Sequence, residues 1–364
     1  MALAQIPFTK LVEDTMLEVR ENSSETAVER KYQRRVNDIY ARDLPTKFDF
    51  GFMRAASSVT ISAVYSTGTV SGTSASTTIT GASTVWVTGH TGWKMKINGN
   101  DEVYTFTWTN ATSGTLSPAL TATIAASTTY VLFQDTYSLA SDYDRLVIPP
   151  GFYYDYGGSK VQISEKFNKD WYRGWTASST LLPVSYRVFG RDSTNLYWQV
   201  QFSPPITTGK KISYEYYPSL ADMTEYTTGT CATTAGDATI TGTSTDFTNN
   251  VAAGDAFRMD SRPNDWYLVS SITTATGLEL TANYPSTIST AADYTICKVP
   301  KLPVGLHLAL FYGACGLSCQ DQDDDSSAKN FLSLYEKTVV QFKVSENRQK
   351  FGRQRMTVKD MYRR

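Results

Sequence analysis

The chain has 364 residues, and its 34 Lys and Arg residues nearly balance its 35 Asp and Glu residues, giving a formal net charge of −1. This length predicts two or three domains with real hydrophobic cores, and the balance excludes a protein whose whole surface attracts nucleic acid. The four cysteines, two of them Cys315 and Cys319 in an apolar stretch, do not have the spacing of a disulfide framework or of a CxxC zinc or redox motif. We expect them to be buried as small hydrophobic residues.

The N-terminal region predicts two helices and the first strand of a central domain. Charged residues interrupt the opening stretch where a secretory signal would be apolar, so we expect the protein to fold in a cytosol. One helix is predicted over residues 8–20, with Val12, Met16 and Val19 on one face. A second is predicted to begin at Ser23 or Ser24 and to end at Pro45.

An internal repeat is the most specific signal in the sequence. The triplet TGT at residues 67–69 recurs at 228–230, and TITG at 78–81 recurs at 239–242, both at an offset of 161. Tyr104 corresponds to Tyr267 and Tyr130 corresponds to Tyr294, so the offset increases only from 161 to 164. Short alternating segments between Gly, Asn and Asp turns predict that each copy is a small antiparallel barrel or sandwich.

The region between the copies does not resemble them and is predicted to be a central antiparallel β domain. Strand-like runs occur at residues 145–148, 186–189, 197–202 and 211–217, separated by proline pairs. We expect the two repeats to be insertions in loops that leave and re-enter this domain. The run of tyrosines at residues 153–156, followed by two glycines, is interpreted as a turn at an interface.

Residues 301–344 predict two helices joined by an acidic turn. The first is apolar almost all round, and the second has one stripe: Phe331, Leu334, Tyr335, Thr338, Val339 and Phe342. The turn contains Asp321, Asp323, Asp324 and Asp325 ahead of Ser326 and Ser327. A helix cap is the favoured interpretation, because a calcium loop requires a glycine and a distal glutamate that are missing here.

After Val344 the helical spacing of apolar residues ends. A basic arm follows, with seven basic residues and one acidic residue over 347–364. We expect this arm to be disordered by itself and to become ordered on a partner. Its predicted partner-binding residues are Arg348, Lys350, Phe351, Arg353, Arg355, Met356, Lys359, Met361, Tyr362, Arg363 and Arg364.

The pattern as a whole predicts an α+β fold: a helical layer formed by the N- and C-terminal helices, a central antiparallel β domain and two inserted β repeats. The predicted divisions are 1–64 for the first helices and strand, 65–134 for the first repeat, 135–222 for the central domain, 223–299 for the second repeat, 300–346 for the helix pair and 347–364 for the arm.

Residues for catalysis are mostly missing. The two histidines, His90 and His307, lie far apart in the sequence, and His307 in an apolar helix is interpreted as a core histidine rather than a ligand. Trp171, Tyr172 and Trp175 could stack on sugars, but such clusters also form protein interfaces, which is the favoured interpretation. We therefore predict no catalytic residues, no metal site, no cofactor and no enzymatic activity.

Three stretches resemble the head-to-tail adaptor, or connector, proteins of tailed bacteriophages. They are the helical opening at residues 34–40 with its proline stop, the central segments 137–146 and 212–217, and the closing helix 303–314 with its acidic turn and residues 328–335 leading to the basic arm. The two repeats are similar to small β modules of phage structural proteins.

The resemblance implies a virion protein of the neck, assembled in the host cytoplasm. Such a protein forms a ring of about twelve copies beneath the portal, connects the capsid to tail or nozzle proteins, and lines the channel through which genomic DNA passes without sequence-specific contacts. The arm would bind the portal, and no membrane is involved. Avidity around the ring would strengthen each weak contact.

Other classes remain open. A tail or receptor-binding protein would use its β modules and the aromatic cluster to bind carbohydrate. A polysaccharide hydrolase would need paired carboxylates in a groove. The isolated arm has enough charge to bind DNA without sequence preference.

Overall fold

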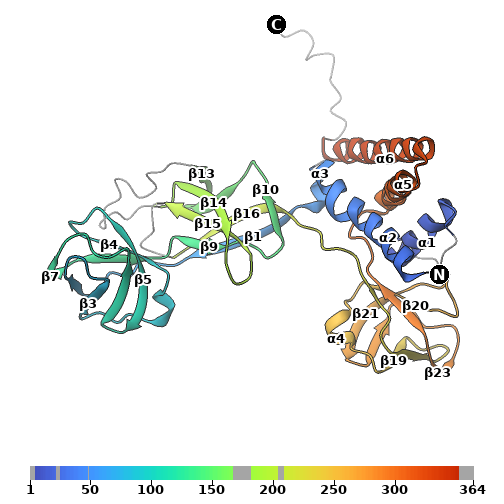
Figure 1. Ribbon diagram of the computed structural model, residues 1–364, viewed down its shortest axis with the longest axis horizontal. Coiled ribbons are helices and arrows are strands. Elements are labelled where there is room, and N and C mark those ends of the chain that lie inside the picture. Colours follow the sequence, from blue (N-terminus) through green and yellow to red (C-terminus); the bar gives the residue numbers. More distant parts are fainter. Residues whose placement is uncertain (1–4, 22–24, 48, 167–181, 204–208, 352–364) are drawn as a thin grey trace, which may run out of the picture. The chain divides into compact units, whose positions relative to one another are not determined.

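The computed structural model describes residues 5–21, 25–47, 49–166, 182–203 and 209–351, with the side chains of 289–291 and 347–351 left undescribed. It is a mixed α+β protein with mostly antiparallel sheets and terminal helices, which confirms the predicted class (Figure 1). The chain forms two compact units. One combines Met1–Gly51 with Leu220–Arg364, and the other is Phe52–Ser219.

The longer α-helices described in the first unit are α1 (Phe8–Glu18), α2 (Thr26–Asn37), α5 (Val304–Asp321) and α6 (Asp325–Phe351). The apolar α5 contacts α1, α2 and α6, so Leu306, Leu310 and Ala314 are completely buried. A side chain at Gly316 would collide with Leu332 of α6, since a Cβ there would lie 2.8 Å from it. The glycine therefore lets α5 and α6 pack closely.

The helical path after α2 continues past the proline that was predicted to end it. A π-helical turn, η1 (Asp38–Asp43), leads directly into α3 (Leu44–Lys47), which contains Pro45. Because proline has no backbone N–H, Pro45 does not itself donate to the hydrogen-bond ladder of this helical path. A 3₁₀ turn, η2 (Gly51–Met53), follows.

The two repeats have the same sheet order over seven strands, and the second has one further edge strand, β17. In the first, the order is β7-β2-β3-β6-β5-β4-β8, formed by β2 (Thr69–Gly72), β3 (Thr78–Ala82), β4 (Lys94–Ile97), β5 (Val103–Asn110), β6 (Ser113–Ser117), β7 (Ile124–Thr128) and β8 (Tyr130–Phe133). In the second, it is β23-β18-β19-β22-β21-β20-β24-β17, formed by β17 (Glu225–Tyr226), β18 (Thr230–Thr233), β19 (Thr239–Thr243), β20 (Ala256–Met259), β21 (Tyr267–Thr274), β22 (Gly277–Leu280), β23 (Ile288–Ala292) and β24 (Tyr294–Cys297). Short helical turns, η3 (Thr88–His90) and α4 (Phe247–Asn250), follow β3 and β19.

Individual hydrogen bonds repeat as well. The Tyr130 hydroxyl donates to the Thr67 carbonyl at 2.8 Å, and the Tyr294 hydroxyl donates to the Thr228 carbonyl at 2.6 Å. All four cysteines are free and buried, as expected, and the apolar residues Val70 and Phe133 are buried in the places of Cys231 and Cys297. The sequence repeat is thus a structural repeat.

The second repeat is attached to the helices of its own unit. The Glu225 carboxylate accepts hydrogen bonds from Thr9 of α1 at 2.5 Å and from Gln33 of α2 at 3.0 Å. Arg258 of β20 forms a bidentate pair with Glu13 of α1, at 2.6 and 3.2 Å. After β24 the chain enters α5, so this repeat does not re-enter the central β domain as we expected.

The second unit contains the first repeat and two further sheets. One has the order β1-β16-β11-β12, with β10 also paired to β16; the other has the order β13-β14-β15-β9. The strands are β1 (Ala55–Ile61), β9 (Thr136–Ser138), β10 (Tyr143–Leu146), β11 (Phe152–Tyr156), β12 (Ser159–Gln162), β13 (Ser164–Glu165), β14 (Ser185–Arg191), β15 (Trp198–Ser203) and β16 (Lys210–Pro218). The first repeat lies between β1 and β9 in the chain, and β13 with β14 is a parallel pair.

These two sheets share an aromatic core. Phe152 packs edge-on against Phe202 with their ring centroids 5.5 Å apart, and Tyr214 lies 5.0 Å from Phe152. The tyrosine run at residues 153–156 lies in strand β11 rather than in the turn we predicted, and the turn comes at Gly157 and Gly158. Tyr154 is buried in the core, whereas Tyr156, next to the turn, is exposed.

Candidate functional site

The predicted binding residues lie where the structure gives no side chains. Arg348, Lys350 and Phe351 fall in the last part of α6, so the helix runs further into the predicted arm than we expected. Outside the described residues lie Arg353, Arg355, Met356, Lys359, Met361, Tyr362, Arg363 and Arg364 of the arm, and Trp171, Tyr172 and Trp175 of the aromatic cluster.

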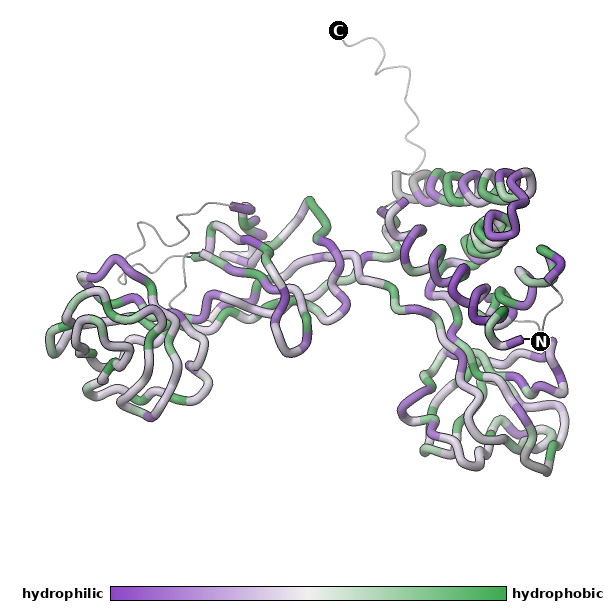
Figure 2. The backbone as a smooth tube through the Cα atoms, in the orientation of Figure 1, coloured by the Kyte–Doolittle hydropathy of each residue, from purple (hydrophilic) through white to green (hydrophobic). Residues whose placement is uncertain are grey.

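Helix α6 has one packed face, and three apolar residues elsewhere on the helix are exposed. Ala328, Tyr335 and Val339 are buried, and the Tyr335 hydroxyl donates to Asp43 at 2.6 Å. Leu334, Val340 and Val344 are each at least 40% exposed, so they are not part of the packed stripe. Figure 2 shows hydrophobic and hydrophilic residues interspersed along this helix.

The start of α6 is fixed by the acidic turn. The Asp324 carboxylate accepts a hydrogen bond from the Ser327 backbone N–H at 3.1 Å and one from the Ser326 hydroxyl at 3.0 Å. The hydrogen bonds with Ser327 and Ser326 hold the pKa of Asp324 below its usual value. This geometry confirms the helix cap, although the capping residue is the aspartate and both serines lie inside the first turn.

His307 of α5 is part of the packed interior of the helices in the first unit. His307 is fully buried, with Nδ1 accepting the Ile6 backbone N–H at 3.0 Å and Nε2 3.0 Å from the Leu302 carbonyl. Burial lowers the pKa of His307, so its neutral form is favoured. It is a core histidine, as the sequence predicts.

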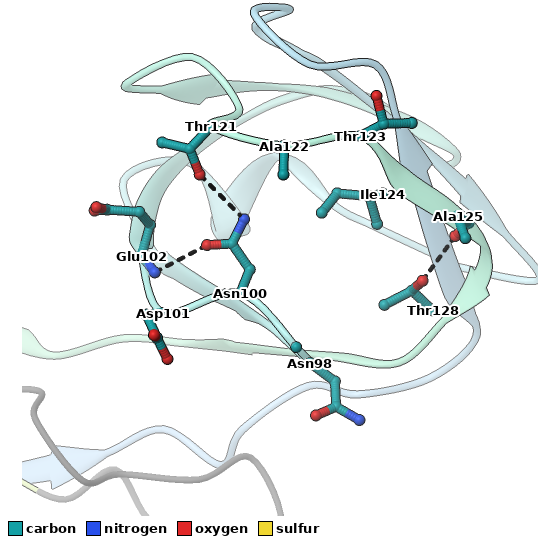
Figure 3. A pocket seen from close by; sticks show the side chains of 11 residues that line it. Asn98, Asn100, Asp101, Glu102, Thr121, Ala122, Thr123, Ile124, Ala125 and Thr128 are labelled. Atoms are coloured by element: carbon teal, nitrogen blue, oxygen red, sulfur yellow. Dashed lines mark hydrogen bonds between the residues drawn. The ribbon is translucent and has the colours of Figure 1, made fainter.

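A polar hollow of about 400 Å³ lies in the first repeat, between the β4–β5 turn and the residues that lead into β7 (Figure 3). Asn100 lies at its edge, donating to the Tyr104 hydroxyl at 2.9 Å and accepting the Glu102 backbone N–H at 2.9 Å. Asp101, Glu102 and Asn98 also line it, and Ile124 forms part of its apolar wall. Because the Asn100 amide is already hydrogen-bonded within the protein, the hollow offers a ligand mainly carboxylate and hydroxyl groups.

The described part of the chain holds no group of three or more His, Cys, Asp or Glu side chains arranged to bind a metal ion. Within the same residues, no helix combines the length and the apolar character needed to span a membrane.

Sequence reasoning missed a cluster at the tip of the hairpin formed by β14 and β15. Phe189 and Leu196 are exposed there, and the Arg191 guanidinium lies 4.8 Å from the centre of the Trp198 ring. A usable signal was present, because the tip sequence places Asp192, Ser193, Thr194 and Asn195 between two strand-like runs.

Comparisons with known protein families and with curated proteins find no match. Among solved structures, the chain is similar to translation elongation factor SelB from Methanococcus maripaludis at 9% identity, over 68% of this chain and 64% of that chain, with a TM-score of 0.16. The chain therefore spans less than two thirds of that structure, and a TM-score this low shows no shared fold.

Proposed function

We propose that this protein is a structural virion protein of the head-to-tail adaptor kind, without enzymatic activity. Copies of the chain form a ring, about twelve in number, beneath the portal of a tailed bacteriophage. The ring connects the capsid to tail or nozzle proteins and surrounds the path of the DNA, and the protein is located in the neck of the virion.

Three exposed apolar residues of α6 carry this proposal. Leu334, Val340 and Val344 are exposed on a helix that is well anchored by its other face, and the same helix leads into the basic arm at 347–364. Exposed apolar residues on a rigid helix followed by a charged arm are typical of a protein that binds neighbours in an assembly. In this proposal the terminal helices form one layer, and the repeats are small barrels or sandwiches that face outward from the ring.

Negative-stain imaging of the purified protein tests the ring. We expect closed rings with a symmetry near twelvefold, because head-to-tail contacts between identical subunits close when their rotation allows it. A protein that stays monomeric at every concentration contradicts the proposal.

Deletion of residues 347–364 tests the arm. We expect rings that still form but no longer bind portal particles in a co-sedimentation assay, because the deleted segment supplies an excess of six positive charges. A matched variant that replaces only the seven basic residues of the arm with Gln separates charge from length. Unchanged portal binding by both variants refutes the role of the arm.

A tail or receptor-binding protein is the second candidate, and the hollow of the first repeat favours it. Its carboxylate and hydroxyl groups are of the kinds that bind sugar hydroxyls. A trimer that binds glycans, with binding lost on replacing Asp101 and Glu102, supports this candidate. A twelvefold ring without glycan binding excludes it.

A further inference from the structure

The tip of the β14–β15 hairpin, residues 189–198, is unusually apolar for an exposed turn. Leu196 is 63% exposed and Phe189 is 38% exposed. At the base of the hairpin, Tyr186 and Val200 belong to the buried core. The hairpin is therefore anchored at one end and presents large side chains at the other.

The tip has a fixed conformation. The Asp192 carboxylate accepts backbone N–H groups from Thr194 at 3.0 Å, Asn195 at 2.5 Å and Tyr197 at 3.0 Å. At the start of the turn, the Arg191 guanidinium stacks on the half-buried Trp198. A surface that is ordered before binding loses less entropy when a partner arrives, and Trp and Arg are the residues that most often dominate the energy of protein interfaces.

Leu196 is in a conformation that does not suit leucine. Its φ is 59°, in the left-handed region that favours Gly and Asn. Among the described residues, the other non-glycine residues at positive φ are small, polar or charged: Arg20, Ala75, Ser83, Ser127, Ser244 and Asp323. Leu196 combines backbone strain with an exposed apolar side chain, so the isolated subunit gains nothing from having leucine at this position.

The charges of the two units indicate what the tip would bind. The Phe52–Ser219 unit has 12 basic and 10 acidic residues, whereas the other unit, residues 1–51 and 220–364, has 22 basic and 25 acidic residues. The acidic excess of that unit lies outside the basic arm, because residues 1–51 and 220–346 have 15 basic and 24 acidic residues. Arg191 is exposed on the positive unit and forms no ion pair with the described residues. The acidic unit of another copy is therefore complementary to the tip in charge.

We propose that the β14–β15 tip binds the acidic unit of a second copy of this chain, with Leu196 as the apolar anchor and Arg191 as the charged contact. The contact is heterologous, since the tip of one copy meets a different surface of the next. The proposal rests on the proposed function, because it assigns residues to a contact of the ring.

Leu196→Asn distinguishes a role in binding from a role in folding, because we expect it to stabilise the folded subunit and to weaken assembly. Asn tolerates the left-handed conformation, so the midpoint of thermal unfolding of the dilute protein should rise. The concentration needed for half-assembly, measured by sedimentation velocity, should rise by roughly tenfold or more. Val184→Thr, at the other end of β14 where Val184 is 58% exposed, is the matched control and should change neither quantity.

Arg191→Glu tests the charge. It should weaken assembly, and the wild-type assembly should weaken with added salt. If Leu196→Asn assembles at the wild-type concentration, or lowers the unfolding midpoint, the tip proposal is wrong although the ring proposal stands. If wild-type protein never assembles, the ring proposal fails and the tip proposal fails with it.

Discussion

Glu225 is a carboxyl group whose protonation is coupled to the docking of the second repeat. Burial raises its pKa, and the hydrogen bond from Thr9 opposes this only in part. A hollow of about 10 Å³, enough for a single water molecule, lies beside it. The folded protein thus holds the Glu225 proton more tightly than the unfolded chain does, so stability falls as pH rises through the raised pKa.

The substitution Glu225→Gln should remove this part of the pH dependence. We expect the variant to be more stable than the wild type at neutral pH, where the wild-type carboxylate is charged and partly desolvated, and the difference to shrink as the pH falls toward the ordinary carboxyl pKa. Each unit by which folding raises the pKa corresponds to about 1.4 kcal/mol. Urea unfolding at several pH values measures this difference in stability, and Glu18→Gln on the exposed side of α1 is the control for the loss of a charge. Identical pH profiles for wild type and Glu225→Gln contradict the prediction.

Gly229 and its counterpart Gly68 hold the same place in the two repeats. Both have φ 82°, and a Cβ at either would lie 2.4 Å from a carbonyl oxygen, that of Thr243 or Ala82. Gly229→Ala should therefore destabilise the protein by more than about 2 kcal/mol. Gly236→Ala, at φ 79° with open space around it, should reduce stability by only about 1 kcal/mol. If Gly229→Ala and Gly236→Ala lose the same stability in thermal denaturation, the close approach to the carbonyl oxygen is unimportant and the prediction is wrong.

At the scale of elements, the junction of α1 with β20 depends on a charge pair. The Arg258 side chain is only 10% exposed, and besides Glu13 it contacts the Pro263 carbonyl at 3.1 Å and the Trp266 ring at 4.7 Å. The repeat is therefore fixed to the helix by a desolvated guanidinium and not by apolar contacts alone.

Removing the carboxylate should leave this guanidinium without its main partner. We expect Glu13→Ala to destabilise the first unit by about 2 kcal/mol, less than for a fully buried pair because Glu13 itself is 41% exposed. The double variant Glu13→Ala with Arg258→Met should recover part of this loss, because no charge is left buried. Chemical denaturation of the three variants gives the coupling energy, and strict additivity disproves the importance of the pair.

At the scale of the whole molecule, the division at residues 51/52 and 219/220 predicts that each unit folds alone. Strand β1 pairs with β16, with Ala55 opposite Tyr216, so the two ends of the Phe52–Ser219 unit lie next to each other. A domain with adjacent ends and its own core can be removed from a chain without disturbing its fold.

We expect a fragment of residues 52–219 to unfold cooperatively, as followed by near-ultraviolet circular dichroism. Residues 1–51 joined to 220–364 by a short Gly-Ser linker should do the same. A fragment cut inside the first unit, such as residues 220–364 alone, is the control, because it lacks α1 and α2 and should not fold cooperatively. If the fragment 52–219 is as unfolded as the fragment 220–364, this division is wrong.

The sequence by itself determined the local features whose cause is local. The repeat, the two C-terminal helices, the Asp324 cap and the buried His307 follow from spacing, capping chemistry and apolar periodicity, which act over a few residues. The strained Leu196 could not be predicted, because a φ angle depends on how the turn around Asp192 closes.

Only the tertiary structure decided which elements pack together. The second repeat joins the helices through Glu225 and Arg258, whose partners lie more than 180 residues away in the sequence, and the first repeat joins the central sheets instead. Two copies of one β module carry no sequence signal for this difference, since it arises from a few outer-face side chains that find their partners only when the chain has folded.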